Sequence, residues 1–212
     1  MKTLAFMLVL LAVAPVSAGT KYRVPLSLLD TQCANGRCYP TAYYDTNRST
    51  SYQRDWSCRT GGSAITYNQH SGSDYGVGGF TGMNQGRWVM AAAAGTVIAA
   101  HDGEYDRCTS ANCGTANYVM IRHADGQVTQ YWHLKKWSVR VKVGQHVGCG
   151  VYIGKVGSSG HSTGPHLHFG AKPSRYAAPV DPYLHAGACG GSSSSLWTSQ
   201  GSWGHLPGNS CQ

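Results

Sequence analysis

The chain has 212 residues and a formal net charge of +8, with 17 Lys and Arg against 9 Asp and Glu. This length is enough for one domain with a hydrophobic core. The basic charge suits polyanionic partners, although it would equally serve solubility. No run of Lys and Arg interleaved with aromatic residues is present, which argues against nucleic acid as a partner.

The N-terminus has the features of a secretory signal peptide over residues 1–18. Lys2 precedes an apolar run, residues 4–15, and the small-residue pattern Val16-Ser17-Ala18 follows it. The apolar run is short for a bilayer span, and an uncleaved anchor is the alternative. We therefore expect a secreted protein, extracellular or periplasmic, with no stable membrane anchor.

The remaining chain divides into three parts by composition. We expect residues 19–60, rich in Tyr and polar residues, to pack as a leader segment on a domain formed by residues 61–186. Residues 187–212 hold the Gly/Ser-rich stretch 190–195 between Cys189 and Cys211. This pattern favours a C-terminal loop closed by its cysteines over a separate binding module.

A candidate metal site begins at His70 and Asp74, an imidazole and a carboxylate four residues apart in a Gly/Ser-rich setting. This setting indicates a loop or strand end. With His168 they make a set of two histidines and one carboxylate, which suits zinc and leaves the fourth position to water. The single glutamate, Glu104, lies outside any His-Glu-x-x-His pattern, so we expect a histidine to be the base.

Residues 117–122 and 128–131 alternate in a way that predicts two strands joined by the turn 124–126. The second strand runs into Tyr131-Trp132-His133, which brings a further histidine to a strand end.

Farther along the chain, His166 and His168 lie two residues apart in an apolar run that begins after Gly164-Pro165. In a strand they would share one face. One imidazole would then bind a metal while the other faces whatever the metal activates. A pair of hydrogen-bonded surface histidines is the alternative interpretation.

The eight cysteines are even in number, and in an exported chain they predict four disulfides. A cysteine-based zinc site is the rival interpretation, which an oxidising compartment disfavours. The equal spacings within two cysteine pairs suggest two local loops, and the tail suggests a third. The expected pairs are Cys33–Cys38, Cys108–Cys113, Cys189–Cys211 and, by what remains, Cys58–Cys149.

The ordered motifs resemble the lysostaphin-type zinc endopeptidases, the family that includes staphylolysin and beta-lytic metalloendopeptidase. The likeness spans about residues 65–175, and it implies a small, mostly antiparallel β-sheet groove with few helices. The motifs that carry it are His70-x-x-x-Asp74, residues 91–98, Tyr131-x-His133-Leu134, residues 141–145, residues 154–160 and Gly164-Pro165-His166-Leu167-His168-Phe169.

This resemblance implies that His70, Asp74 and His168 bind one zinc ion per chain. It also implies that His133 and His166 polarise or deprotonate the attacking water and stabilise the tetrahedral intermediate. The expected function is a monomeric endopeptidase of residues 61–186 that cleaves stem or cross-bridge peptides of peptidoglycan, with anionic wall polymers as further partners. The alternative is a non-enzymatic, zinc-containing binding protein on the same scaffold, similar to an animal chemotaxin, which would need neither catalytic histidine.

Overall fold

The computed structural model describes residues 19–28, 33, 37–47, 49, 51–62, 65–110, 112–184 and 193–212. The predicted signal peptide lies outside these ranges and stays a prediction, and Cys189 also lies outside the described residues. Within the described part of the chain, no helix is long and apolar enough to cross a membrane.

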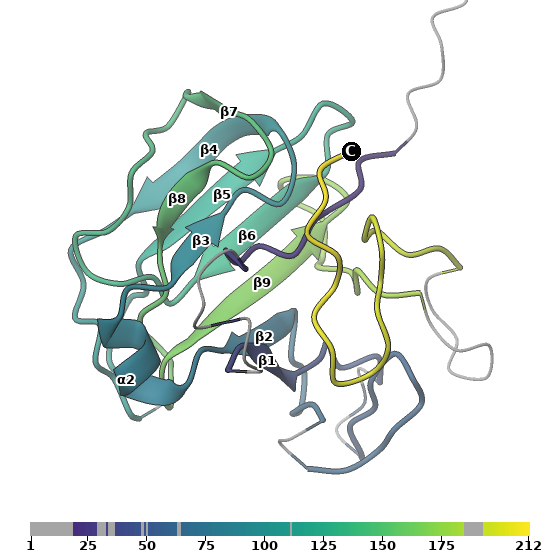
Figure 1. The fold of residues 1–212 in the computed structure, drawn as a ribbon. Helices are drawn as coiled ribbons and strands as arrows, with labels where there is room; N and C mark the ends of the chain where they lie inside the picture. Colours follow the sequence, from purple (N-terminus) through teal and green to yellow (C-terminus); the bar gives the residue numbers. More distant parts are fainter. Residues whose placement is uncertain are drawn as a thin grey trace, which may run out of the picture.

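Antiparallel pairing organises the chain into a seven-stranded sheet and a smaller two-stranded sheet (Figure 1). The large sheet has the order β1-β2-β9-β6-β5-β4-β7, and β3 pairs with β8 in the small one. The predicted mainly β, antiparallel fold is confirmed. The elements are β1 (Tyr39–Ala42), β2 (Ser73–Gly76), α2 (Gly79–Asn84), β3 (Trp88–Met90), β4 (Gly95–His101), β5 (Tyr118–Arg122), β6 (Val128–Trp132), β7 (His146–Val147), β8 (Tyr152–Lys155) and β9 (His166–Lys172).

The predicted hairpin is present as β5 and β6, with Tyr118 opposite Trp132 and Arg122 opposite Val128. The turn is closed by the Gly126 N–H, which donates to the His123 carbonyl at 3.0 Å. Gly126 has φ 87°, a left-handed conformation that glycine adopts without steric cost.

Alternation along β9 separates the core from an open face of the sheet. Leu167 and Phe169 are fully buried, whereas His166 and His168 are only partly buried. Leu167 and Phe169 pack in the same core as Tyr131. The two histidines therefore share one face, as their spacing predicts.

Both ends of the described chain contribute to this core. Tyr22 and Trp197 are buried and form a parallel bridge, and their rings lie 6.3 Å apart. Figure 1 shows the C-terminal segment, in yellow, running beside the purple N-terminal one. Trp197, in the predicted C-terminal loop, is thus a core residue, and its indole packs against Tyr22 and Phe169.

Two of the expected disulfides, Cys33–Cys38 and Cys108–Cys113, are confirmed. The other two expected pairs are wrong, because Cys149 bonds to Cys211 across 62 residues. The physical reason is that the chain end follows the N-terminal segment, with the Val24 N–H donating to the Gly208 carbonyl at 2.7 Å. This path brings Cys211 to Cys149, while Cys58 is disulfide-bonded elsewhere.

His123 follows β5 and is buried, with 3% of its surface exposed. Its Nδ1–H donates to the Ala94 carbonyl at 2.8 Å, and its Nε2 lies 2.9 Å from the Thr129 hydroxyl. Burial lowers the pKa of His123, and the nearby Asp125 carboxylate opposes this shift without overcoming it. The Tyr22 ring, 5.4 Å away, also covers the imidazole.

We expect this buried imidazole to weaken the fold in acid. The unfolded chain binds the proton first, near pH 6.5, so the His123 contribution is complete above that pH and is lost as the pH falls toward the lower folded pKa. His123→Gln should therefore give a free energy of unfolding that declines less steeply below pH 6.5 than that of the natural chain. Chemical denaturation between pH 8 and pH 5 measures both slopes.

The matched control is His146→Gln, which changes an exposed histidine in β7. It should keep the slope of the natural chain. Parallel curves for the natural chain and His123→Gln would show that His123 does not contribute to the acid response.

Candidate functional site

Strand register brings three of the predicted site segments together. On β9, His168 lies opposite Asp74 of β2 on one side and opposite Trp132 of β6 on the other. Directly paired residues of antiparallel strands point to the same face. His166, opposite Gly76, lies in the adjacent row of that face.

The ligand atoms of His70, Asp74 and His168 converge on one point. His70 Nε2 lies 3.1 Å from Asp74 Oδ1 and 3.2 Å from His168 Nδ1, and the last two atoms are 2.9 Å apart. In a tetrahedral site with zinc bonds near 2.0–2.1 Å, neighbouring ligand atoms stand about 3.3 Å apart. The three donors therefore fit a zinc ion.

Outer contacts orient two of these ligands. The His70 Nδ1–H donates to the Tyr43 carbonyl at 2.6 Å, which leaves Nε2 with a lone pair toward the cluster. The Tyr67 hydroxyl donates to Asp74 Oδ2 at 3.1 Å, and the Tyr67 ring stacks on His70 at 4.1 Å. Neither tyrosine was predicted from the sequence; Tyr43 acts through its backbone carbonyl, which carries no residue signature.

The electrostatics of the cluster also suit a cation. Burial raises the pKa of Asp74, but the close approach of His70, His166 and His168 outweighs it and holds that pKa well below its usual range. Burial lowers the pKa of His168 despite Asp74. A carboxylate and two imidazoles are the ligand types that zinc binds in proteins.

His133 and His166 flank the cluster with their ring centroids 4.6 Å apart. The His133 Nδ1–H donates to the Ser159 carbonyl at 2.7 Å, and the His166 Nδ1–H donates to the Gly164 carbonyl at 2.8 Å. The Nε2 atom of each ring is therefore the lone-pair nitrogen. His166 Nε2 lies 3.7 Å from Asp74 Oδ1, which places it directly beside the three donors.

His133 has an unusual backbone conformation, with φ 65° immediately after β6. A left-handed conformation is uncommon for residues other than glycine, and such strain is frequent at functional sites. The conformation is held from both sides, because the Gly157 N–H donates to the His133 carbonyl and the Leu134 N–H donates to Asn117, each at 3.0 Å. Burial, with His166 and His168 nearby, lowers the pKa of His133 to about 3, so the ring is neutral at pH 7.

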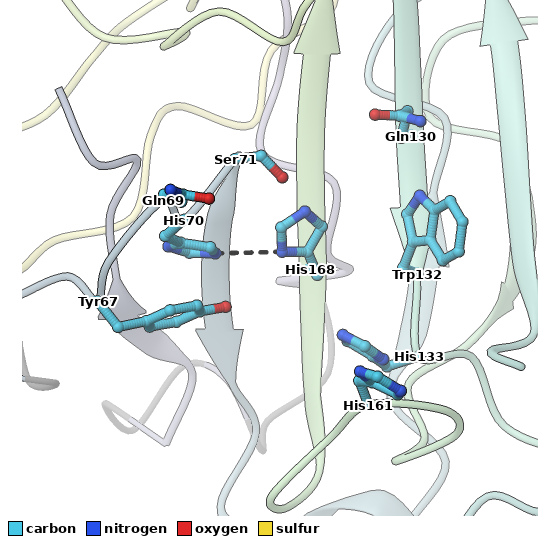
Figure 2. Close-up of a pocket in the computed structure, with 9 residues that line it drawn as sticks. All are labelled: Tyr67, Gln69, His70, Ser71, Gln130, Trp132, His133, His161 and His168. Atoms are coloured by element: carbon cyan, nitrogen blue, oxygen red, sulfur yellow. Dashed lines mark hydrogen bonds between the residues drawn. The ribbon is translucent and has the colours of Figure 1, made fainter. Parts of the chain in front are cut away.

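His70, His133 and His168 line a groove with a volume of about 370 Å³. Figure 2 shows the His168 side chain on β9 between His70 on one side and Trp132 on the other. Asp74 and His166 line another hollow, together with Gly164 and Pro165, and Tyr67 lines both this hollow and the groove. The groove is lined by Tyr67, Gln69, His70, Ser71, Gln130, Trp132, His133, His161 and His168.

The fold and this site define a mainly β protein in which two histidines and a carboxylate that could hold a metal ion lie together on the sheet. Residues 68–182, more than half of the chain, match the family described as Peptidase family M23. The chain belongs to this family, and the resemblance to lysostaphin-type endopeptidases is confirmed.

Three relatives illustrate the similarity. The cell division protein DipM of Caulobacter vibrioides is 37% identical over 119 residues, which are 53% of this chain and 19% of DipM. The DD-carboxypeptidase/endopeptidase Mpg of Neisseria meningitidis is 38% identical over 117 residues, 55% of this chain and 23% of Mpg. The solved catalytic domain of lysostaphin from Staphylococcus simulans is 31% identical and covers 54% of this chain and 77% of that chain, with a TM-score of 0.43. The chain thus spans less than a quarter of either curated relative.

Proposed function

We propose that this protein is a zinc endopeptidase that, after export, hydrolyses stem or cross-bridge peptides of bacterial peptidoglycan. The observation that carries the proposal is the convergence of three zinc-type donors beside two imidazoles whose Nδ1 atoms contact backbone carbonyls. Membership of Peptidase family M23 supports it. So does the name of the relative Mpg, a DD-carboxypeptidase/endopeptidase.

In this proposal His70, Asp74 and His168 hold the zinc ion. When bound, zinc acts as a Lewis acid toward a carbonyl oxygen and lowers the pKa of water toward about 7. The carboxylate cancels only one of the two positive charges, and burial of Asp74 and His70 keeps the remaining charge from being screened by solvent.

His133 and His166 supply the proton chemistry. Both imidazoles hold their Nδ1 protons toward backbone carbonyls, so each Nε2 is available to accept a proton from water or to donate one once protonated. Their rings are fixed 4.6 Å apart on one side of the cluster. One imidazole can therefore deprotonate the attacking water, and an imidazole whose Nε2 carries a proton can donate it to the developing oxyanion.

The direct test is digestion of purified cell walls that carry different cross-bridges. We expect zinc-loaded, oxidised protein to release fragments with new amino termini from at least one wall type, with mass spectrometry of the fragments identifying the bond. His166→Ala should release none above background. Wall attachment without new amino termini from any wall type would instead indicate the non-enzymatic binding protein.

A further inference from the structure

A separate hollow lies beside the small sheet and shares none of the lining residues of the groove. It has a volume of about 390 Å³. Half of its lining side chains are cationic: Lys135, Lys136 and Arg140 on the segment after β6, and Lys155 at the end of β8. The complete lining is Trp88, Lys135, Lys136, Trp137, Ser138, Val139, Arg140 and Lys155.

Within the part of the chain that the structure describes, none of these four cationic groups forms an ion pair with a carboxylate within 4.0 Å. Four like charges around one hollow repel each other, and their potentials add inside it. An anion in the hollow would offset this repulsion.

Two carboxylates beside this segment accept hydrogen bonds from its backbone. Asp102 accepts hydrogen bonds from the N–H groups of Trp137 at 2.8 Å and Val139 at 2.9 Å. Asp106 accepts one from the Lys136 N–H at 2.9 Å. These bonds fix the backbone of the segment, so the hollow is formed before any ligand arrives.

Aromatic rings position the cationic groups. Lys155 Nζ lies 4.4 Å and Arg140 Cζ 4.6 Å from the centroid of the Trp88 ring, and Tyr152 stacks on Trp88 at 5.0 Å. Such contacts hold the guanidinium and ammonium groups on the ring without removing their charge. Trp137, at the rim, is 77% exposed and offers a flat apolar surface beside the cations.

We propose that this hollow binds the phosphate groups of an anionic polymer attached to the cell wall, a poly(polyol phosphate) or poly(sugar phosphate). Lysines and an arginine bind phosphate, and the exposed indole suits the carbon face of a sugar or polyol. Lys135 is only two residues from His133. A polymer bound in the hollow would therefore keep the cell wall to which it is attached close to the groove. That consequence rests on the proposed function, whereas phosphate binding does not.

A compact hollow favours this polymer over nucleic acid. Proteins that bind single strands use a longer basic groove that follows several nucleotides, with a series of stacking rings. Here the cations surround one volume of about 390 Å³. A short single-stranded DNA of equal charge therefore serves as the competing ligand in the test.

The test measures binding of soluble poly(glycerol phosphate) to the full oxidised chain by calorimetry. The variant Lys135→Gln/Arg140→Gln should weaken binding at least tenfold and flatten its salt dependence, because fewer counterions are released. The matched control Arg122→Gln/Lys142→Gln removes the same charge from exposed positions outside the hollow. It should lose less than threefold. Unfolding midpoints of both variants verify the fold.

If both double variants lost the same polymer affinity, binding would depend on the overall positive charge of the protein, and the proposed site would be wrong. Equally tight binding of the DNA, lost with the same variant, would overturn the polymer assignment. Repeating the titration with His166→Ala separates this proposal from the enzymatic one, because binding should persist without catalysis. In the active chain, Lys135→Gln/Arg140→Gln should slow lysis of phosphate-polymer walls while leaving cleavage of a short neutral peptide unchanged.

Discussion

His168→Ala is expected to leave the purified protein without stoichiometric zinc and without peptidase activity. A site with three protein ligands has no spare donor, and His168 Nδ1 lies within 3.2 Å of both other ligand atoms. A bound metal contributes several kcal/mol to the transition state, and about 1.4 kcal/mol is a factor of ten, so the rate should fall at least about a thousandfold. Elemental analysis and a peptide-release assay measure the two effects.

The control for this substitution is His161→Ala, which removes a histidine that lines the same groove but lies outside the ligand cluster. It should retain one zinc ion per chain. Adding a chelator to the natural protein should abolish activity, and added zinc should restore it, whereas His168→Ala should not respond to zinc. One zinc ion per chain in His168→Ala would refute the ligand assignment.

Replacing either flanking histidine should separate catalysis from metal binding. His166→Ala should keep the fold and one zinc ion per chain, yet lose about 10² to 10⁴ in rate, the usual contribution of a general acid or base. For His133 the sharper substitution is His133→Asn, because asparagine tolerates the left-handed conformation at φ 65° that alanine would strain. The same loss of rate is expected.

Zinc content and unfolding midpoints, measured beside the rates, decide the interpretation. A loss of zinc in step with His168→Ala would mean that the substituted histidine is a ligand. That outcome is most informative for His166, whose Nε2 lies 3.7 Å from Asp74 Oδ1. Unchanged rates with full zinc would remove the histidine from the proposed mechanism.

Features that depend on neighbours along the chain could be predicted from the sequence. Alternation of apolar residues and the Gly126 turn define the hairpin of β5 and β6, since strand period and turn type are local properties. The same alternation places His166 and His168 on one face of β9. Two cysteine pairs five residues apart form local disulfides because such short loops close readily.

Features that depend on long-range packing were decided only by the tertiary structure. His70 meets His168 across 98 residues because β2 pairs with β9 in one register, and a shift of one residue would turn Asp74 to the other face. The Tyr43 carbonyl that orients His70 belongs to the backbone, which every residue shares, so no sequence pattern marks it. The disulfide between Cys149 and Cys211 also depends on long-range packing. The path of the C-terminal segment along the core brings the two cysteines together, and cysteine spacing in the sequence does not encode that path.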